Sequence, residues 1–192
     1  MGKIRKLLRR SVATVLLVAL GAVSARADAT EDRIAALQAK FRCPIFNYLN
    51  AIHAVPTYAR TDNRYLIIII EHRGDERYYA QCAFDNLDTR MICELDSPFF
   101  NPTMKKYFRG DKLKLIKALG YRLHRKNNYY QWRKSLTPED RYEIAGLLVD
   151  TIGRVFDMRA DETLMYEAPL VTGTPKPIEY AAKYCEPQIS LR

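Results

Sequence analysis

Two segments that alternate apolar and polar side chains constrain the fold of this chain more than any other feature. They are Arg77 to Phe84 and Arg90 to Leu95, and each places a cysteine in its apolar set. Such alternation is typical of a strand that buries one face. A tight turn at Leu87-Asp88 would pair the strands antiparallel, with Cys82 opposite Cys93. The pattern therefore predicts a β-hairpin whose two cysteines share a face.

The sequence contains four cysteines, an even number that suggests two disulfides: Cys43, Cys82, Cys93 and Cys185. Four cysteines allow three connectivities. Residues opposed in an antiparallel pair lie about 4.5–5.5 Å apart at Cα, within disulfide reach. The hairpin therefore favours Cys82–Cys93, which leaves Cys43–Cys185 to join the ends of the domain. The alternative is four reduced, buried cysteines.

A third strand is predicted at Tyr65 to Glu71, where four consecutive isoleucines make both alternating faces apolar. Such a run fits a central strand covered on each side, or one covered on one side and meeting a partner on the other. Arg73-Gly74-Asp75-Glu76 reads as a turn that leads into the hairpin. Together the three strands predict an antiparallel meander.

Helices are predicted on both sides of this meander. Apolar residues recur at helical spacing from Thr30 to Ile52, and Pro44 interrupts them, which indicates two short helices or one kinked helix. Asp111 to Leu119 is amphipathic and precedes Gly120, a suitable C-terminal cap. Another helix begins at Thr137-Pro138, with a capping hydroxyl, a proline and acids in its first turn.

The order of elements predicts a single disulfide-stapled α+β domain over residues 28–167, an antiparallel β-meander flanked by N-terminal and C-terminal helices. Short strands at Tyr121 to Leu123 and Tyr129 to Trp132, around an Asn127-Asn128 turn, complete the expected elements. Residues 168–192 contain several prolines and are predicted to form an extended C-terminal tail.

The first 27 residues have the composition of a secretory signal peptide. A basic start precedes the uncharged segment Ser11 to Val23, and Ala25-Arg26-Ala27 offers small residues for cleavage. The apolar segment is shorter than the ~20 residues that span a bilayer. An uncleaved anchor is the alternative, and both the general and the twin-arginine routes stay open. The signal predicts a periplasmic or secreted protein whose mature chain has no transmembrane segment.

Removal of this segment reduces the positive charge of the chain. Six basic residues and no acidic one would leave, so the formal charge falls from +9 to about +3. Positive charge is concentrated in a basic aromatic segment, residues 103–134, whose local charge of about +10 exceeds that of the whole mature chain. It has eleven lysines and arginines against one acid, Asp111, interleaved with tyrosines, Phe108 and Trp132.

Basic side chains mixed with aromatic rings are typical of surfaces that bind acidic proteins, phosphates or anionic headgroups. A solvated face with inward-turned rings is the structural alternative. The contact residues that we predict are Lys112, Lys117, Arg125, Tyr130 and Trp132. Three hypotheses follow: an exported module that binds a protein through a sheet face or edge, a module for an anionic ligand (envelope lipid, polysaccharide or nucleic acid), and a small hydrolase.

No catalytic, cofactor or metal motif supports the hydrolase. The three histidines, His53, His72 and His124, are far apart in sequence and lack ligand spacing. The carboxylate pairs Asp85/Asp88 and Glu94/Asp96 flank the hairpin and read as strand-end and turn residues. We therefore expect no catalytic residue, no cofactor and no bound metal.

The chain resembles the TY-Chap group, domains similar to type III secretion chaperones. The likeness covers roughly Ala35 to Asp157. The segments that carry it are Tyr79-Ala80-Gln81-Cys82-Ala83-Phe84, Cys93-Glu94-Leu95, Ala118-Leu119-Gly120-Tyr121 and the Thr137-Pro138-Glu139 helix start. The resemblance implies a helix, an antiparallel meander and further helices in a non-enzymatic, dimeric module that holds another protein. Secretion chaperones act in the cytosol, so an export signal separates this chain from that role.

Overall fold

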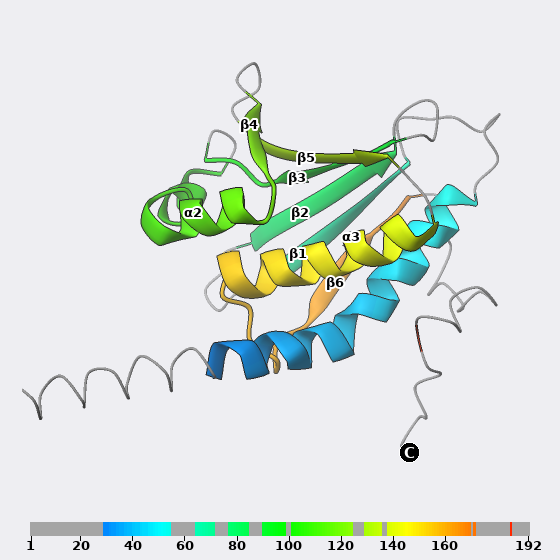
Figure 1. Ribbon diagram of the computed structural model, residues 1–192, viewed down its shortest axis with the longest axis horizontal. Coiled ribbons are helices and arrows are strands. Elements are labelled where there is room, and N and C mark those ends of the chain that lie inside the picture. The colour runs from blue at the N-terminus through cyan, green and yellow to red at the C-terminus, as the bar shows by residue number, and fades with distance from the viewer. Residues whose placement is uncertain are drawn as a thin grey trace, which may run out of the picture.

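The computed structural model describes residues 29–54, 64–71, 77–84, 90–98, 101–124, 129–135, 138–169, 171 and 185. An N-terminal helix at residues 29–53 comes first (Figure 1). The elements that follow are β1 (Tyr65–Glu71), β2 (Arg77–Phe84), β3 (Arg90–Leu95), the 3₁₀ helix η2 (Pro102–Lys106), α2 (Gly110–Ala118), β4 (Arg122–His124), β5 (Tyr129–Ser135), α3 (Pro138–Asp150), the π-helical turn η3 (Thr151–Val155) and β6 (Leu164–Glu167).

The strands form one six-stranded antiparallel sheet in the order β4-β5-β3-β2-β1-β6. The predicted α+β class is confirmed, and β1, β2 and β3 form the expected meander. The sheet is larger than predicted. The segment Leu164–Glu167, which the sequence analysis did not assign to a strand, pairs antiparallel with Ile67–Ile70 of β1.

One face of the sheet carries the hydrophobic core. In β1, β2 and β3 every second side chain is buried, as their alternation predicts. The N-terminal helix and α3 cross this face, and α2 lies at one end of it (Figure 1). The fully buried apolar side chains of these strands are Leu66, Ile68, Ile70, Tyr78, Ala80, Cys82, Met91 and Cys93.

The N-terminal helix is a single element that continues through Pro44 and changes direction along its length (Figure 1). Proline removes one backbone hydrogen bond and bends a helix rather than ending it where tertiary contacts hold both halves. Arg64, which is buried, donates to the carbonyl oxygens of Ile52 and His53, 3.4 Å away in each case. This guanidinium stabilises the carboxyl end of the helix.

Two glycines let α3 and η3 approach the N-terminal helix closely. A Cβ atom at Gly153 would lie 2.5 Å from Ile34 Cδ1 and 2.9 Å from Leu37 Cδ1. At Gly146 a Cβ would lie 3.0 Å from Cζ of Arg42, whose guanidinium also stacks 3.8 Å from the centroid of the Tyr142 ring. The absence of side chains at these glycines therefore sets the distance between the N-terminal helix and α3 with η3.

Polar contacts hold the same pair of elements together at the surface. Arg154 of η3 donates two hydrogen bonds of 2.7 Å to the carboxylate of Glu31, and this pairing lowers the pKa of Glu31. Arg33 donates to the carbonyl oxygen of Met158 at 2.8 Å, and Gln38 to that of Gly146 at 2.9 Å. The helix is thus fixed at several points along its length.

The helix α2 ends at Ala118, one residue earlier than predicted, and Leu119 is its C-cap. Gly120 follows with a φ of +93°, a conformation that favours glycine. The next residue, Tyr121, is fully buried, and its hydroxyl donates to Thr151 Oγ1 at 3.1 Å, because that hydroxyl itself donates to the Leu147 carbonyl. Burial raises the pKa of Tyr121. These bonds join the start of β4 to α3 and η3.

The structure contains both disulfides, in the pairing that the strand register favours. Cys82–Cys93 lies on the buried face, and Cys43–Cys185 joins the N-terminal helix to a point far along the chain. Disulfides of this kind indicate an oxidising environment. Within the described residues, no helix is long and apolar enough to cross a membrane.

Several predicted features lie outside the described residues. They are the signal peptide at 1–27, the turns at Leu87-Asp88 and Asn127-Asn128, and most of the tail at 168–192.

The two disulfides are expected to differ in their contribution to stability. The Cys43–Cys185 bridge spans 142 residues and the Cys82–Cys93 bridge 11. Chain entropy gives upper figures of about 5 kcal/mol for the long loop and about 3 kcal/mol for the short one. Denaturant unfolding should therefore show a larger loss of unfolding free energy for the double variant Cys43→Ala, Cys185→Ala than for the double variant Cys82→Ala, Cys93→Ala. Equal losses, or the reverse order, would contradict this assignment.

Substitution of Gly153 tests the close helix contact. Gly153→Leu forces a side chain against Ile34 and Leu37 and should cost about 3 kcal/mol of unfolding free energy or more. Ala118→Leu adds a similar volume at an exposed helical position and should change stability by less than about 0.5 kcal/mol. Thermal melts of both variants check this, and similar melting temperatures for the two would refute the packing argument.

Candidate functional site

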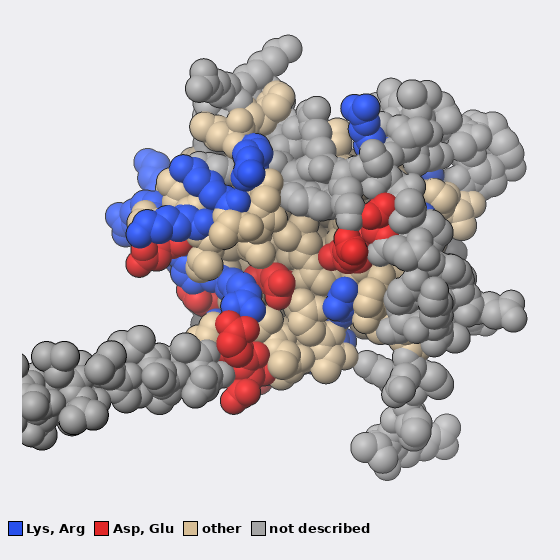
Figure 2. Space-filling view, viewed as in Figure 1, with Lys and Arg blue, Asp and Glu red and all other residues tan. Residues whose placement is uncertain are grey.

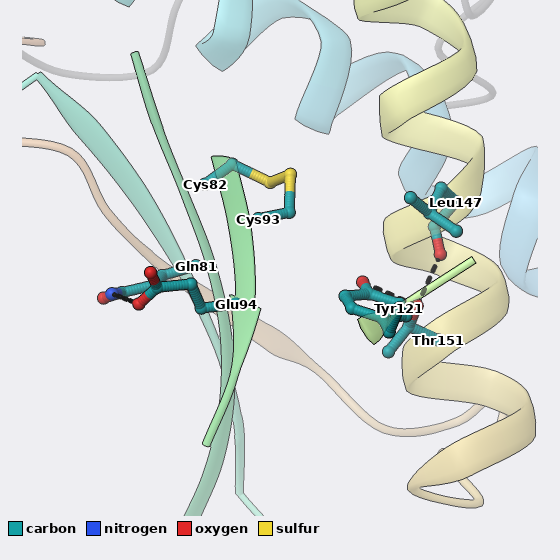
Figure 3. Close-up of a disulfide and its surroundings, with 7 residues drawn as sticks. All are labelled: Gln81, Cys82, Cys93, Glu94, Tyr121, Leu147 and Thr151. Carbon is teal, nitrogen blue, oxygen red and sulfur yellow. Dashed lines mark hydrogen bonds between the residues drawn. A yellow bond between two sulfur atoms is a disulfide. The ribbon is translucent and has the colours of Figure 1, made fainter. Parts of the chain in front are cut away.

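The second face of the sheet carries no helix within the described residues, and its side chains stay partly or fully exposed. In Figure 3 the Cys82–Cys93 disulfide points toward the helices, whereas Gln81 and Glu94 point away from them. We call this surface the helix-free face. Its residues are Tyr65, Ile67, Ile69, Tyr79, Gln81, Ala83, Ile92, Glu94, Met165 and Glu167.

On the helix-free face, apolar side chains lie on both sides of the Gln81–Glu94 pair, and Glu167 lies on the edge strand β6. The register places Ile69 between Tyr79 and Met165, and Met165 is one of the two most exposed large apolar side chains in the described chain, at 38%. Gln81 donates to the Glu94 carboxylate at 3.0 Å, and the Tyr65 hydroxyl donates to Glu167 at 3.4 Å. Each of these two carboxylates is thus held in place by a neighbouring side chain.

A buried carboxylate lies where β3 ends. Asp96 is 2% exposed, and its Oδ2 accepts a 2.8 Å hydrogen bond from Asn101. The other oxygen, Oδ1, has no hydrogen-bond partner among the described residues. Burial raises the pKa of Asp96, against the opposing effect of the Asn101 bond. The pKa of Tyr79 is also raised, first by its own burial and then by the charges of Asp96 and Glu94.

Basic side chains gather on a different part of the molecule. They lie on η2, α2 and the start of β4, and Figure 2 shows them together over α2 and the base of β4. The only carboxylate on α2 is Asp111, which pairs with Lys114 at 2.8 Å. We call this group the basic surface. Its exposed residues are Lys105, Lys106, Arg109, Lys114, Lys117 and Arg122.

The predicted contact residues have different positions in the structure. Lys117 is exposed on the basic surface. Lys112 is partly exposed and is held by other parts of the chain, because its Nζ lies 2.5 Å from Asp157 and donates to the Arg154 carbonyl at 2.6 Å. Tyr130 and Trp132 lie on β5, opposite Leu123 and Cys93 in the register, and their side chains are outside the described part. Arg125 is not among the described residues.

The edges of the sheet are short. β4 has three residues and β6 has four. β4 pairs with Tyr129–Gln131, so the described strands leave Trp132–Ser135 of β5 paired only with β3. That stretch of outer edge is where the strand addition predicted from the sequence could take place.

The described part of the structure brings together no set of residues that would support the hydrolase hypothesis. All four cysteines are in disulfides, so none is available as a nucleophile. His53 lies at the end of the N-terminal helix beside the Phe84 ring, and His124 lies on β4. His72 is not described. No group of three or more His, Cys, Asp or Glu side chains in the described ranges could hold a metal ion.

None of the contact residues predicted from the sequence belongs to the helix-free face. Its signal was present, because the consecutive isoleucines at 67–70 make both faces of β1 apolar. That pattern left two possibilities, a second covering layer or a partner, and the described residues supply no second layer.

The buried carboxylate leads to a pH-dependent prediction. The folded-state pKa of Asp96 is above the usual 3.8, so the folded protein favours the protonated carboxyl. Its contribution to stability is complete below pH 3.8, and it is lost as the pH rises through the folded-state pKa. Asp96→Asn has no such group. The melting temperature of the variant relative to the parent protein should therefore rise between about pH 3.5 and pH 7. A constant difference across this range would refute the shift.

Comparison with known proteins gives no match: no family model, no curated protein and no solved structure matches this chain.

Proposed function

We propose that this protein is an exported, non-enzymatic module that binds another protein through its helix-free face. The supporting observation is the unequal covering of the sheet. Three helical elements lie on one side, whereas the other presents Ile67, Ile69 and Ile92 with no described element above them.

The composition of the helix-free face indicates the chemistry of its partner. Contiguous exposed apolar surface rimmed by polar groups is typical of protein interfaces. The isoleucines, Tyr79 and Met165 supply the apolar area, and Glu94 of β3 and Glu167 of β6 supply negative charge. A complementary partner presents apolar side chains flanked by lysine or arginine.

The outer edge of β5 offers a second mode of contact to the same partner. An extended segment added beside Trp132–Ser135 would continue the sheet by backbone hydrogen bonds. The resemblance to secretion-chaperone domains supports a holding role, and the disulfides support a location outside the cytosol. The alternative is that a second copy of the chain covers this face. The mass of a cross-linked adduct distinguishes a second copy from a different protein.

A charge placed in an apolar row of the helix-free face tests this proposal. Ile69→Lys puts an ammonium group between Tyr79 and Met165 and should reduce partner binding by about tenfold. The measurement is cross-linking of the tagged mature protein in envelope extract at moderate salt, with quantification of the main adduct. Undiminished cross-linking by a folded Ile69→Lys protein would overturn the proposal.

A matched variant controls for charge alone. Ala160→Lys adds the same charge at an exposed position on the other side of the domain, beside the loop that Lys40 contacts. It should give the same adduct as the parent protein. Thermal melts of both variants establish that each is folded, and the mass of the adduct shows whether the partner is a second copy.

We infer a second candidate function, binding of an anionic ligand, from the basic surface. The elements η2, α2 and β4, with Arg109, carry these six exposed cations and one acid, Asp111, although the mature chain as a whole carries only about +3. Such a local field attracts polyanions at a rate and strength that fall with salt.

A further inference from the structure

We propose that the anionic ligand of the basic surface is a membrane of acidic phospholipid, on which α2 and β4 dock. The inference rests on the second candidate function and adds the class of its ligand. It depends on four neighbouring residues of the described chain: Lys114, Lys117, Arg122 and Leu123.

The structure places these residues next to one another. Lys114 and Lys117 are both exposed and lie one turn apart on α2. Arg122 donates a 3.2 Å hydrogen bond to the Lys117 carbonyl, which fixes the start of β4 against the end of α2. Leu123 follows directly. The three cations therefore lie close together where α2 meets β4, and Lys114 also pairs with Asp111. The side chain of Leu123 leaves the strand on the side opposite to that of Arg122.

The exposed side chain of Leu123 favours a membrane over other polyanionic ligands. It is 50% exposed, the higher of the two exposed large apolar side chains in the described chain. A polysaccharide or a nucleic-acid backbone gives a leucine little apolar area to contact, whereas the headgroup–acyl boundary of a bilayer does. Surfaces that bind membranes reversibly combine such apolar side chains with lysines and arginines.

The surrounding strand pair supports the same ligand. The register places Tyr130 opposite Leu123 and Tyr129 opposite His124, so two tyrosines belong to the β-hairpin that carries the leucine. Tyrosine is enriched at the level of lipid headgroups. In Figure 1 β4, the edge strand, projects away from the N-terminal helix.

The test compares vesicles of phosphatidylglycerol mixed with phosphatidylcholine against vesicles of phosphatidylcholine alone, by flotation over a range of salt concentrations. The mature protein should bind only the acidic vesicles, with affinity that falls as salt rises. The triple variant Lys114→Gln, Lys117→Gln, Arg122→Gln should bind about 100-fold more weakly, since each basic residue near an acidic membrane contributes roughly fivefold.

Two further variants make the result specific. Lys40→Gln, Arg77→Gln, Arg159→Gln removes the same charge from exposed positions elsewhere and should leave vesicle binding within about twofold of the parent. Leu123→Ser should weaken vesicle binding by about tenfold but leave heparin binding unchanged. Melting temperatures confirm that the variants are folded.

Three outcomes would overturn the inference. They are no binding to acidic vesicles, an equal loss in the two triple variants, and vesicle binding that Leu123→Ser does not weaken. Heparin binding that the α2–β4 triple variant abolishes, without vesicle binding, would retain the second candidate function and reject the membrane. None of these results bears on partner binding by the helix-free face, because Ile69→Lys tests that surface separately.

Discussion

The two-residue alternation of side chains across β1, β2 and β3 is the constraint on which the rest of this structure depends. Leu66, Ile68 and Ile70 point to the same face as Cys82 and Cys93, so the helices must cover that face to bury them. The intervening residues then point the other way. Because Ile67 and Ile69 are apolar as well, the same alternation that builds the core leaves an apolar second face.

The helical layer is fixed tightly to the buried face. Gly146 and Gly153 allow close packing of α3 and η3 on the N-terminal helix, and Arg154 ties that helix to η3 at its start. The Cys82–Cys93 disulfide lies beneath this layer. A rigid scaffold of this kind holds a binding surface in one conformation, which lowers the entropic cost of association.

The two candidate surfaces differ in charge and in position. The helix-free face carries the carboxylates Glu94 and Glu167, whereas the basic surface lies on η2, α2 and β4. This separation allows a protein partner and an acidic membrane to be bound together. In that arrangement the domain would hold its partner beside the membrane, a role consistent with the export signal expected at residues 1–27.

The sequence was sufficient to predict local and near-neighbour features. The hairpin register, the capping position of Gly120 and the start of α3 at Pro138 depend on residues close together in the chain, and all three are found. β6 was not predicted because Leu164–Glu167 is short and gains its strand geometry by pairing with β1, about a hundred residues earlier.

Long-range pairing also explains the outcome for Lys112. Lys112 was predicted as a contact residue, and in the structure it also pairs with Asp157, which is 45 residues away in the chain. Composition cannot reveal which cations of a basic segment form ion pairs or hydrogen bonds with distant parts of the same chain. Conversely, Lys117 is exposed because α2 turns that position away from the core.

The central claim is that the helix-free face is covered by another protein in the envelope. Hydroxyl-radical footprinting of the mature protein, alone and in envelope extract, tests this most directly because Met165, Tyr65 and Tyr79 all react when exposed. The account predicts that these three side chains become protected in the extract, whereas Tyr142 on α3 keeps its reactivity. Unchanged labelling of all three, under conditions where the protein forms a cross-linked adduct, would contradict it.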